Sequence, residues 1–116
     1  RPMKLEVLAG GDAVAWIRLE GRLDLPGVEE VELLYTVKAA RAETPVVVDL
    51  RAVTFVGSLA IGMFVSAART LGLRGHGTVF FGATAHIDEV LRIAGIDRVA
   101  VLAGTEDEAL QAIGAS

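Results

Sequence analysis

The chain has 116 residues, of which 53% are hydrophobic, and its eleven basic and fifteen acidic residues give a formal net charge of −4. This length and apolar fraction favour one domain with its own core over residues 3–116, and Arg1-Pro2 ahead of Met3 is interpreted as a cloning remnant. The negative charge argues against a nucleic-acid partner. The absence of cysteine excludes disulfides, thiol catalysis and cysteine-ligated zinc. No apolar run reaches the roughly 20 residues of a membrane span and no signal-peptide pattern is present, so we expect a cytoplasmic protein without membrane insertion.

The first part of the chain predicts a hairpin. Lys4–Leu8 and Ala13–Leu19 are interpreted as two strands joined by a glycine-rich turn at Gly10–Asp12. Gly21 is expected to end this unit.

A helix is predicted to follow the hairpin. Asp24 suits the N-cap, Pro26 suits the first turn, and the helix should run to about Ala42. Its positions on the helical period predict a core stripe of Val28, Val31, Leu34 and either Val37 or Lys38.

The middle of the chain predicts a buried strand and a long helix. The unbroken apolar run Val46–Val48 follows Pro45 and indicates a strand over Val46–Leu50 that is buried on both faces at the centre of the sheet. After a short loop, the second helix is predicted over Ser58–Leu73. Its expected core stripe is Ile61, Phe64, Val65, Ala68 and Leu71.

The remaining elements continue the alternation of strands and helices. They are a strand at Thr78–Phe81, a helix from the cap Thr84 through Ile93 with Gly95 as its terminator, a strand at Arg98–Leu102, and a helix at Thr105–Ile113 that begins with a capping box. The predicted fold class is α/β, with a mixed, mostly parallel sheet, an N-terminal hairpin and about four helices.

The motifs of enzymes and metal sites are incomplete in this sequence. Gly57 and Gly62 have the spacing of a phosphate-binding loop, but Met63-Phe64 stands where that loop needs Lys-Ser/Thr. No serine lies in a Gly-x-Ser-x-Gly elbow, and neither His76 nor His86 has neighbours that mark it as a base. We therefore expect no catalytic residues, no metal site and no cofactor.

Ser58 is the candidate for a regulatory modification. It lies at the expected start of the second helix, where unpaired backbone N–H groups favour negative charge. The other two serines are Ser66, well inside the same helix, and Ser116, the last residue. A plain helix cap is the alternative explanation of Ser58, because serine is preferred at that position.

Three motifs in order resemble the STAS domain, and most closely the bacterial anti-sigma factor antagonists. They are Glu20-Gly-Arg-Leu-Asp24, the run from Val47-Val-Asp-Leu50 through Val53-Thr-Phe-Val-Gly-Ser58 to Gly62, and Leu91-Arg-Ile-Ala-Gly-Ile96. The resemblance extends from about Leu5 to Ala112. It implies a STAS-like fold for residues 3–116.

The resemblance also implies a function without catalysis. Proteins of this family bind an anti-sigma factor that is also a serine kinase, and phosphorylation of a serine at the start of the second helix switches them off. That position matches Ser58, so the resemblance implies a bacterial phosphoprotein in transcription regulation. The family usually shows Asp-Ser-Ser-Gly here, whereas this chain has Gly57-Ser-Leu-Ala60.

The expected partner surface lies at the starts of the two helices. We predict that Asp24, Gly57, Ser58, Leu59 and Met63 form it, with Leu59 and Met63 as its apolar part. Two other functions remain open from the sequence. One is an accessory subunit docked on the ATPase of a membrane transport complex and never phosphorylated, which the apolar segment after Gly57 favours. The other is a small-ligand sensor that uses the carboxyl ends of the parallel strands.

Overall fold

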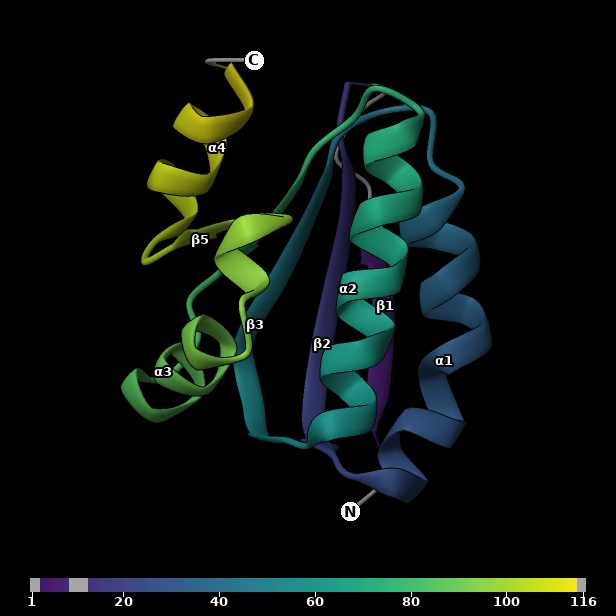
Figure 1. Ribbon diagram of the computed structural model, residues 1–116, viewed down its shortest axis with the longest axis vertical. Helices are drawn as coiled ribbons and strands as arrows, with labels where there is room; N and C mark the ends of the chain where they lie inside the picture. The colour runs from purple at the N-terminus through teal and green to yellow at the C-terminus, as the bar shows by residue number, and fades with distance from the viewer. Residues whose placement is uncertain (1–2, 9–12, 115–116) are drawn as a thin grey trace.

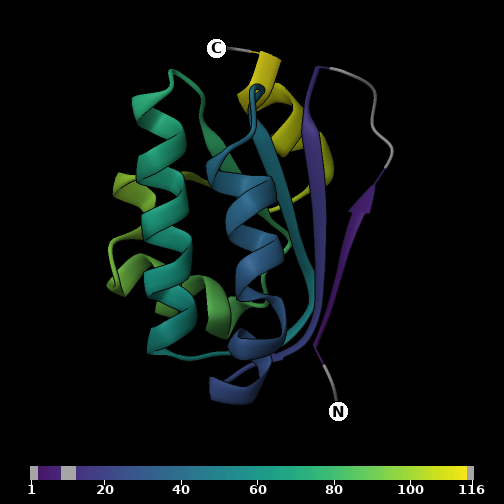
Figure 2. The same cartoon turned by 90° about the vertical axis from the view of Figure 1, so that its right-hand side faces the viewer.

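The structure is a computed structural model that describes residues 3–8 and 13–114. A five-stranded sheet carries α1 and α2 on one face and α4 on the other (Figures 1 and 2). The strands are β1 (Lys4–Leu8), β2 (Ala15–Leu23), β3 (Val46–Val56), β4 (Thr78–Phe81) and β5 (Val101–Ala103). The helices are α1 (Leu25–Ala40), α2 (Ser58–Leu73), α3 (Ala85–Ile93) and α4 (Glu106–Gly114), with a 3₁₀ turn at Ile96–Arg98.

The sheet is mixed and its strands lie in the order of the sequence, β1-β2-β3-β4-β5. β1 pairs antiparallel with β2, and the other pairs are parallel. The predicted fold class is thereby confirmed, and so is the central place of the Val46–Leu50 strand, whose five residues are all buried. The predicted turn at Gly10–Asp12 and the first two residues lie outside the described residues.

β2 and β3 are longer than the sequence predicts. Gly21 was expected to end the hairpin, but β2 continues to Leu23 through two shifts of register against β3. Gly21 has a φ of 112°, which favours glycine, and lies at one of these shifts. β3 also continues through the expected loop to Val56. The last residues of both strands therefore lie at the edge of the sheet where α1 and α2 begin.

The main core lies between the sheet and α1 and α2. Tyr35 on α1 and Phe64 on α2 pack ring against ring with centroids 5.4 Å apart, and Phe64 also contacts Phe80 of β4 at 4.8 Å. In α1 the predicted stripe is half wrong, because Leu34 and Val37 are exposed. The buried positions of α1 are Gly27, Val28, Val31, Tyr35, Ala39 and Ala40.

α2 buries a wider arc than the sequence predicts, because it packs against both the sheet and α1. Ile61 and Val65 of the predicted stripe are only partly buried. The buried positions of α2 are Ala60, Met63, Phe64, Ala67, Ala68 and Leu71.

The C-terminal third follows the prediction except around β5. Gly95 has the expected left-handed φ of 86°. The strand expected at Arg98–Leu102 is shorter in the structure. The 3₁₀ turn occupies Ile96–Arg98, and β5 begins only at Val101 and ends at Ala103. The capping box of α4 is confirmed, since the N–H of Glu108 donates to Thr105 Oγ1 and the N–H of Thr105 donates to Glu108 Oε1, both at 3.1 Å.

The same substitution should have opposite effects at two helical glycines. A Cβ at Gly27 would collide with the backbone oxygen of Arg22 and lie 2.8 Å from Met3 Cγ, whereas a Cβ at Gly62 meets nothing within 4 Å. Gly27→Ala should therefore lower the free energy of unfolding by about 1–3 kcal/mol through overpacking. Gly62→Ala should raise it by about 0.5–1 kcal/mol, because alanine restricts the unfolded chain. Urea denaturation of both variants tests this, and equal shifts of the same sign would contradict the close packing of Gly27.

Candidate functional site

The starts of α1 and α2 lie side by side at one edge of the sheet (Figure 1). β2 and β3 are parallel and end in register, with Leu23 opposite Val56. The two turns that follow are joined by a hydrogen bond in which the N–H of Gly57 donates to the carbonyl oxygen of Leu23 at 3.0 Å. Two segments that are far apart in the sequence, residues 23–25 and 55–59, thus form one surface at this edge.

Asp24 is the N-cap of α1, as the sequence predicts. Its carboxylate accepts a hydrogen bond from the N–H of Gly27 at 3.0 Å, and Arg22 Nε donates to its other oxygen at 3.4 Å. The hydrogen bond from Gly27 is the main cause that holds the pKa of Asp24 below its ordinary value, with the Arg22 guanidinium adding to it. Asp24 is therefore ionised at neutral pH and bound to its own helix.

The start of α2 has no side-chain cap. Gly57 is the N-cap, with extended backbone angles, and Ser58 is the first residue of the helix. The interpretation of Ser58 as a cap is therefore wrong. Its side chain is exposed, and among the described residues its hydroxyl has no hydrogen-bond partner. The first helical bond of α2 runs from the N–H of Ile61 to the carbonyl of Gly57, so the N–H groups of the preceding residues point out of the helix end without partners in the helix.

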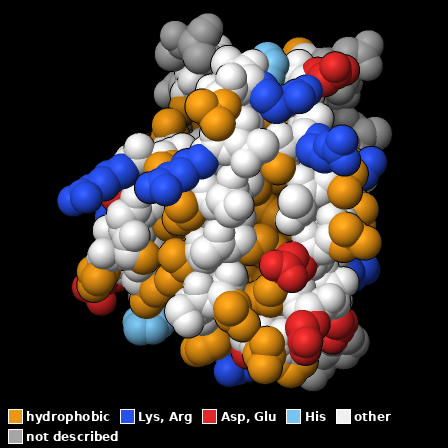
Figure 3. Space-filling view, turned by 45° about the vertical axis from the view of Figure 1, so that its right-hand side comes forward, with side chains coloured by type: hydrophobic (Ala, Val, Ile, Leu, Met, Phe, Trp, Pro, Cys, Tyr) orange, Lys and Arg blue, Asp and Glu red, His pale blue; other side chains and the backbone are white. Residues whose placement is uncertain are grey.

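An apolar surface surrounds these two helix starts. Leu25, Phe55 and Leu59 are large side chains that are 56%, 38% and 55% exposed. With Asp24, Gly57, Ser58 and the adjoining Leu23 they line an open pocket. Figure 3 shows hydrophobic side chains at the lower end of the molecule, where α1 and α2 begin. We call the group Asp24, Leu25, Phe55, Gly57, Ser58 and Leu59 the helix-start surface.

The structure brings together four of the five residues predicted for the partner surface, and excludes the fifth. Asp24, Gly57, Ser58 and Leu59 line the same pocket. Met63 is only 5% exposed and belongs to the main core, so its assignment to the surface is wrong. It lies one turn after Leu59 but faces inward, because α2 is packed on two sides.

Two contributors to this surface were missed by sequence reasoning. Phe55 lies opposite Arg22 in the register of β2 and β3, and the Arg22 guanidinium lies 4.4 Å from the centre of the Phe55 ring. Leu25 follows Asp24 directly and points outward from the first turn of α1. Parallel pairing of β2 with β3 was the signal that could have identified them. It implies that the residues beside Asp24 lie next to the residues beside Gly57.

Among the residues of the helix-start surface Asp24 alone is ionisable, and it is bound to the N–H of Gly27 and to Arg22. Neither His76, in the turn after α2, nor His86, in the first turn of α3, lines this surface. Within residues 3–8 and 13–114, no three His, Cys, Asp or Glu side chains are grouped as a metal site would need. None of the described helices has the length and apolar character to cross a membrane.

Comparisons with known proteins agree with this fold. The family model described as "Mlab, STAS domain" matches residues 7–104. No curated protein sequence matches the chain. An anti-sigma-factor antagonist (STAS) domain protein from Planctomyces limnophilus superposes with a TM-score of 0.79 at 21% identity, over 98% of this chain and 99% of that one.

Two further solved structures show the range of proteins that share the fold. An anti-sigma factor antagonist from Mycobacterium paratuberculosis has a TM-score of 0.77 and 26% identity, over 97% of this chain and 94% of that one. The murine Solute Carrier 26 family member A9 anion transporter has a TM-score of 0.69 and 16% identity. That match covers 86% of this chain but only 18% of the transporter, so the same fold is one part of a much larger protein. From the family match and the shared fold, the chain belongs to the STAS domain family, and its architecture is that of the anti-sigma factor antagonists.

Proposed function

We propose that the chain is a non-catalytic protein-interaction module that binds an anti-sigma factor with serine kinase activity through the helix-start surface. The observation that carries the proposal is the exposed Ser58 hydroxyl at an uncapped helix start, set among the exposed side chains of Leu25, Phe55 and Leu59. Large exposed apolar side chains that gather at one place are typical of interaction sites. A kinase partner that packs on this surface has the acceptor hydroxyl within its contact area.

The same geometry supports a switch by phosphorylation of Ser58. A phosphate adds about −1.5 to −2 charges at neutral pH, and the unpaired N–H groups at the start of α2 favour an anion there. The fold should therefore tolerate the modification. Partner binding should not, because the partner would have to cover a dianion that already faces the ionised Asp24 across the same pocket.

A second candidate function is an accessory subunit on the ATPase of a membrane transport complex, without phosphorylation. Two observations favour it. The segment Gly57–Ala60 lacks the carboxylate and the second serine of the usual family motif. The fold also occurs within a transporter, the murine anion transporter described above. In this function the helix-start surface would be a permanent docking site in which Ser58 contributes contact alone.

Calorimetric titration against two purified partners separates these functions. The two proteins to be tested are a histidine-kinase-like anti-sigma factor and a transport ATPase from the same source organism as this chain. The proposed function predicts saturable binding to the anti-sigma factor, loss of that binding after incubation with ATP, and a mass increase of one phosphate on the peptide that contains Ser58. Binding to the transport ATPase alone, with no phosphate on Ser58, would replace the proposed function by the second one.

A further inference from the structure

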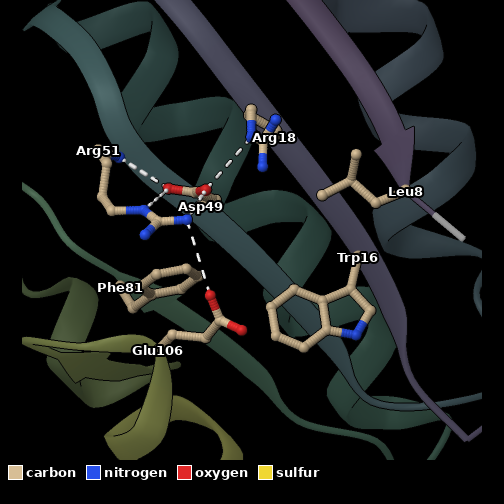
Figure 4. Close-up of a pocket in the computed structure, with 7 residues that line it drawn as sticks. All are labelled: Leu8, Trp16, Arg18, Asp49, Arg51, Phe81 and Glu106. Atoms are coloured by element: carbon tan, nitrogen blue, oxygen red, sulfur yellow. Dashed lines mark hydrogen bonds and ion pairs between the residues drawn. The ribbon is translucent and has the colours of Figure 1, made fainter. Parts of the chain in front are cut away.

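A second pocket lies on the opposite face of the sheet, away from α1 and α2. α4 covers β4 and β5 on this face, where Val47, Val79, Phe81 and Ala109 form a separate small core. Beside α4 the sheet is open, and a pocket of about 330 Å³ lies there (Figure 4). This volume is at the lower end of the range of small-molecule sites. No part of the helix-start surface lines it.

A buried carboxylate organises the floor of this pocket. Asp49 on the central strand is 3% exposed. Arg51 Nε and Nη2 donate to its two oxygens at 3.1 and 2.9 Å, and Arg18 Nε donates to Oδ2 at 3.4 Å. Burial acts to raise the pKa of Asp49, but the hydrogen bonds and charge of Arg51, with Arg18, outweigh it and hold that pKa below its ordinary value. The two guanidinium groups therefore meet at one oxygen atom of an ionised carboxylate.

Arg51 is fixed on further sides. Its guanidinium lies 5.0 Å from the centre of the Phe81 ring. Its aliphatic stem packs against Gly82, which has a φ of 76° and where a Cβ would collide with Arg51 Cγ. A long, half-exposed arginine normally loses much rotational freedom when it binds a ligand, and this loss weakens binding. The contacts of Arg51 with Asp49, Phe81 and Gly82 already restrict that freedom before a ligand binds. This arrangement is a preorganised donor group on an open surface.

The pocket also has unused donors beside an apolar wall. Among the described residues, Arg51 Nη1 and Arg18 Nη2 donate no hydrogen bond. Trp16 packs edge-on against Phe81 with ring centroids 6.3 Å apart, and Leu8 extends this wall (Figure 4). An apolar wall therefore stands next to guanidinium groups whose remaining N–H bonds face no acceptor in the part of the chain that the structure describes.

Competing carboxylates at the rim are held loosely. Glu106 of α4 approaches Arg51 Nη2 at 3.7 Å, and Glu6 of β1 approaches Arg18 Nη1 at 4.0 Å. Both distances exceed that of a charge-assisted hydrogen bond, which is about 2.7–2.9 Å. An incoming oxyanion can make shorter bonds to the same donors than these two carboxylates do.

We propose that this pocket binds a small organic anion, in which a flat apolar ring lies against Trp16 and an oxyanion, carboxylate or phosphate, accepts hydrogen bonds from Arg18 and Arg51. Such a ligand would bind without covering the helix-start surface. The chain would then carry a ligand site in addition to its partner site, on the face of the sheet rather than at the carboxyl ends of the strands.

Trp16 provides a direct probe, because it is the only tryptophan in the chain. We would titrate the whole ¹⁵N-labelled chain with benzoate, with phenyl phosphate and with neutral benzyl alcohol, and follow the single indole N–H resonance. The proposal predicts saturable shifts with at least one of the two anions and at least tenfold weaker binding of benzyl alcohol. The anion that binds more tightly shows whether the pocket prefers a carboxylate or a phosphate. Absence of saturation with both anions, or equal binding of benzyl alcohol, would overturn the proposal.

Variants assign the binding to the guanidinium groups. Arg18→Gln and Arg51→Gln should each weaken binding of the stronger anion at least tenfold, and Glu106→Gln should strengthen it by removing a competing charge. Arg69→Gln, at an exposed position on α2, is the matched control and should leave the affinity unchanged. Arg18→Gln keeps the bidentate pair of Arg51 with Asp49. This variant therefore still tests the binding if the loss of Arg51 lowers the stability of the fold. Unchanged affinity in Arg18→Gln and Glu106→Gln would overturn the assignment, whatever partner the helix-start surface binds.

Discussion

Met63→Lys should unfold much of the protein, whereas Leu59→Lys, one turn earlier on α2, should leave it folded and abolish partner binding. Met63 is 5% exposed within the main core, so the lysine loses the burial of the methionine and places a charge among apolar side chains. We expect a loss of at least about 3 kcal/mol in the free energy of unfolding, or roughly 12 °C or more in the melting temperature. Leu59 is 55% exposed, so lysine there should cost no more than about 0.3–1 kcal/mol through its charge at the helix start.

Leu33→Lys is the matched control for the effect of Leu59→Lys on binding. Leu33 is an exposed leucine of α1, 80% accessible, outside the helix-start surface. Thermal melting and calorimetric titration of the three variants give both readouts. Loss of binding in Leu33→Lys but not in Leu59→Lys would place the partner on the outer face of α1 instead of the helix-start surface. A Met63→Lys variant as stable as the unmodified chain would contradict the burial of Met63 in the core.

Ser58→Glu should weaken partner binding at least tenfold while leaving the fold intact. The carboxylate lies at the uncapped start of α2, where negative charge contributes about 0.3–1 kcal/mol of stability. A tenfold loss of affinity corresponds to about 1.4 kcal/mol, which is modest for a charge that the partner has to desolvate. Ser58→Ala should keep full binding and change stability by less than about 0.5 kcal/mol, because Gly57 and not Ser58 occupies the cap position.

Ser66→Glu controls for added charge on the same helix. Ser66 is exposed and lies two turns further along α2, outside the pocket of the helix-start surface. Its glutamate variant should bind the partner as the unmodified chain does. If the glutamate and alanine variants at Ser58 bind equally well, charge at this position does not control the interaction.

Much of the fold could be predicted because several signals depend only on local chemistry. The apolar run Val46–Val48 does not alternate with polar residues, which is typical of a strand covered on both faces. The caps Asp24 and Thr84 and the capping box from Thr105 to Glu108 mark helix starts through bonds within three residues, and all are present. Such contacts do not depend on how the elements pack.

The errors arose where packing decides. α1 has apolar residues around most of its circumference, so the helical period did not show whether Leu34 or the neighbouring Tyr35 faces the core. Met63 was assigned to the surface because the sequence pattern of α2 marks only the face that packs on the sheet. The second buried face of α2 results from contact with α1, and the sequence of α2 alone does not indicate that contact. Gly21 was interpreted as a strand end, although a glycine in a paired strand also permits a shift of register.

The candidate site was predicted only in part, because some of its residues are marked by local sequence signals and others come together only through packing. Asp24, Gly57 and Ser58 could be found because they mark helix starts, and the parallel pairing of β2 with β3 brings those starts together. The pocket on the open face could not be found, because Arg18, Asp49 and Glu106 meet only through strand register and the return of α4.

Mapping of the partner on the isotope-labelled chain tests the central proposal most directly. Backbone amide resonances would be recorded before and after addition of the proposed partner, an anti-sigma factor with serine kinase activity. The account predicts that the largest changes lie at Leu25, Phe55, Ser58 and Leu59, and that they disappear when the chain carries Ser58→Glu. Changes confined to the outer face of α1 around Leu33, or to the open face of the sheet around Trp16 and Arg51, would contradict it.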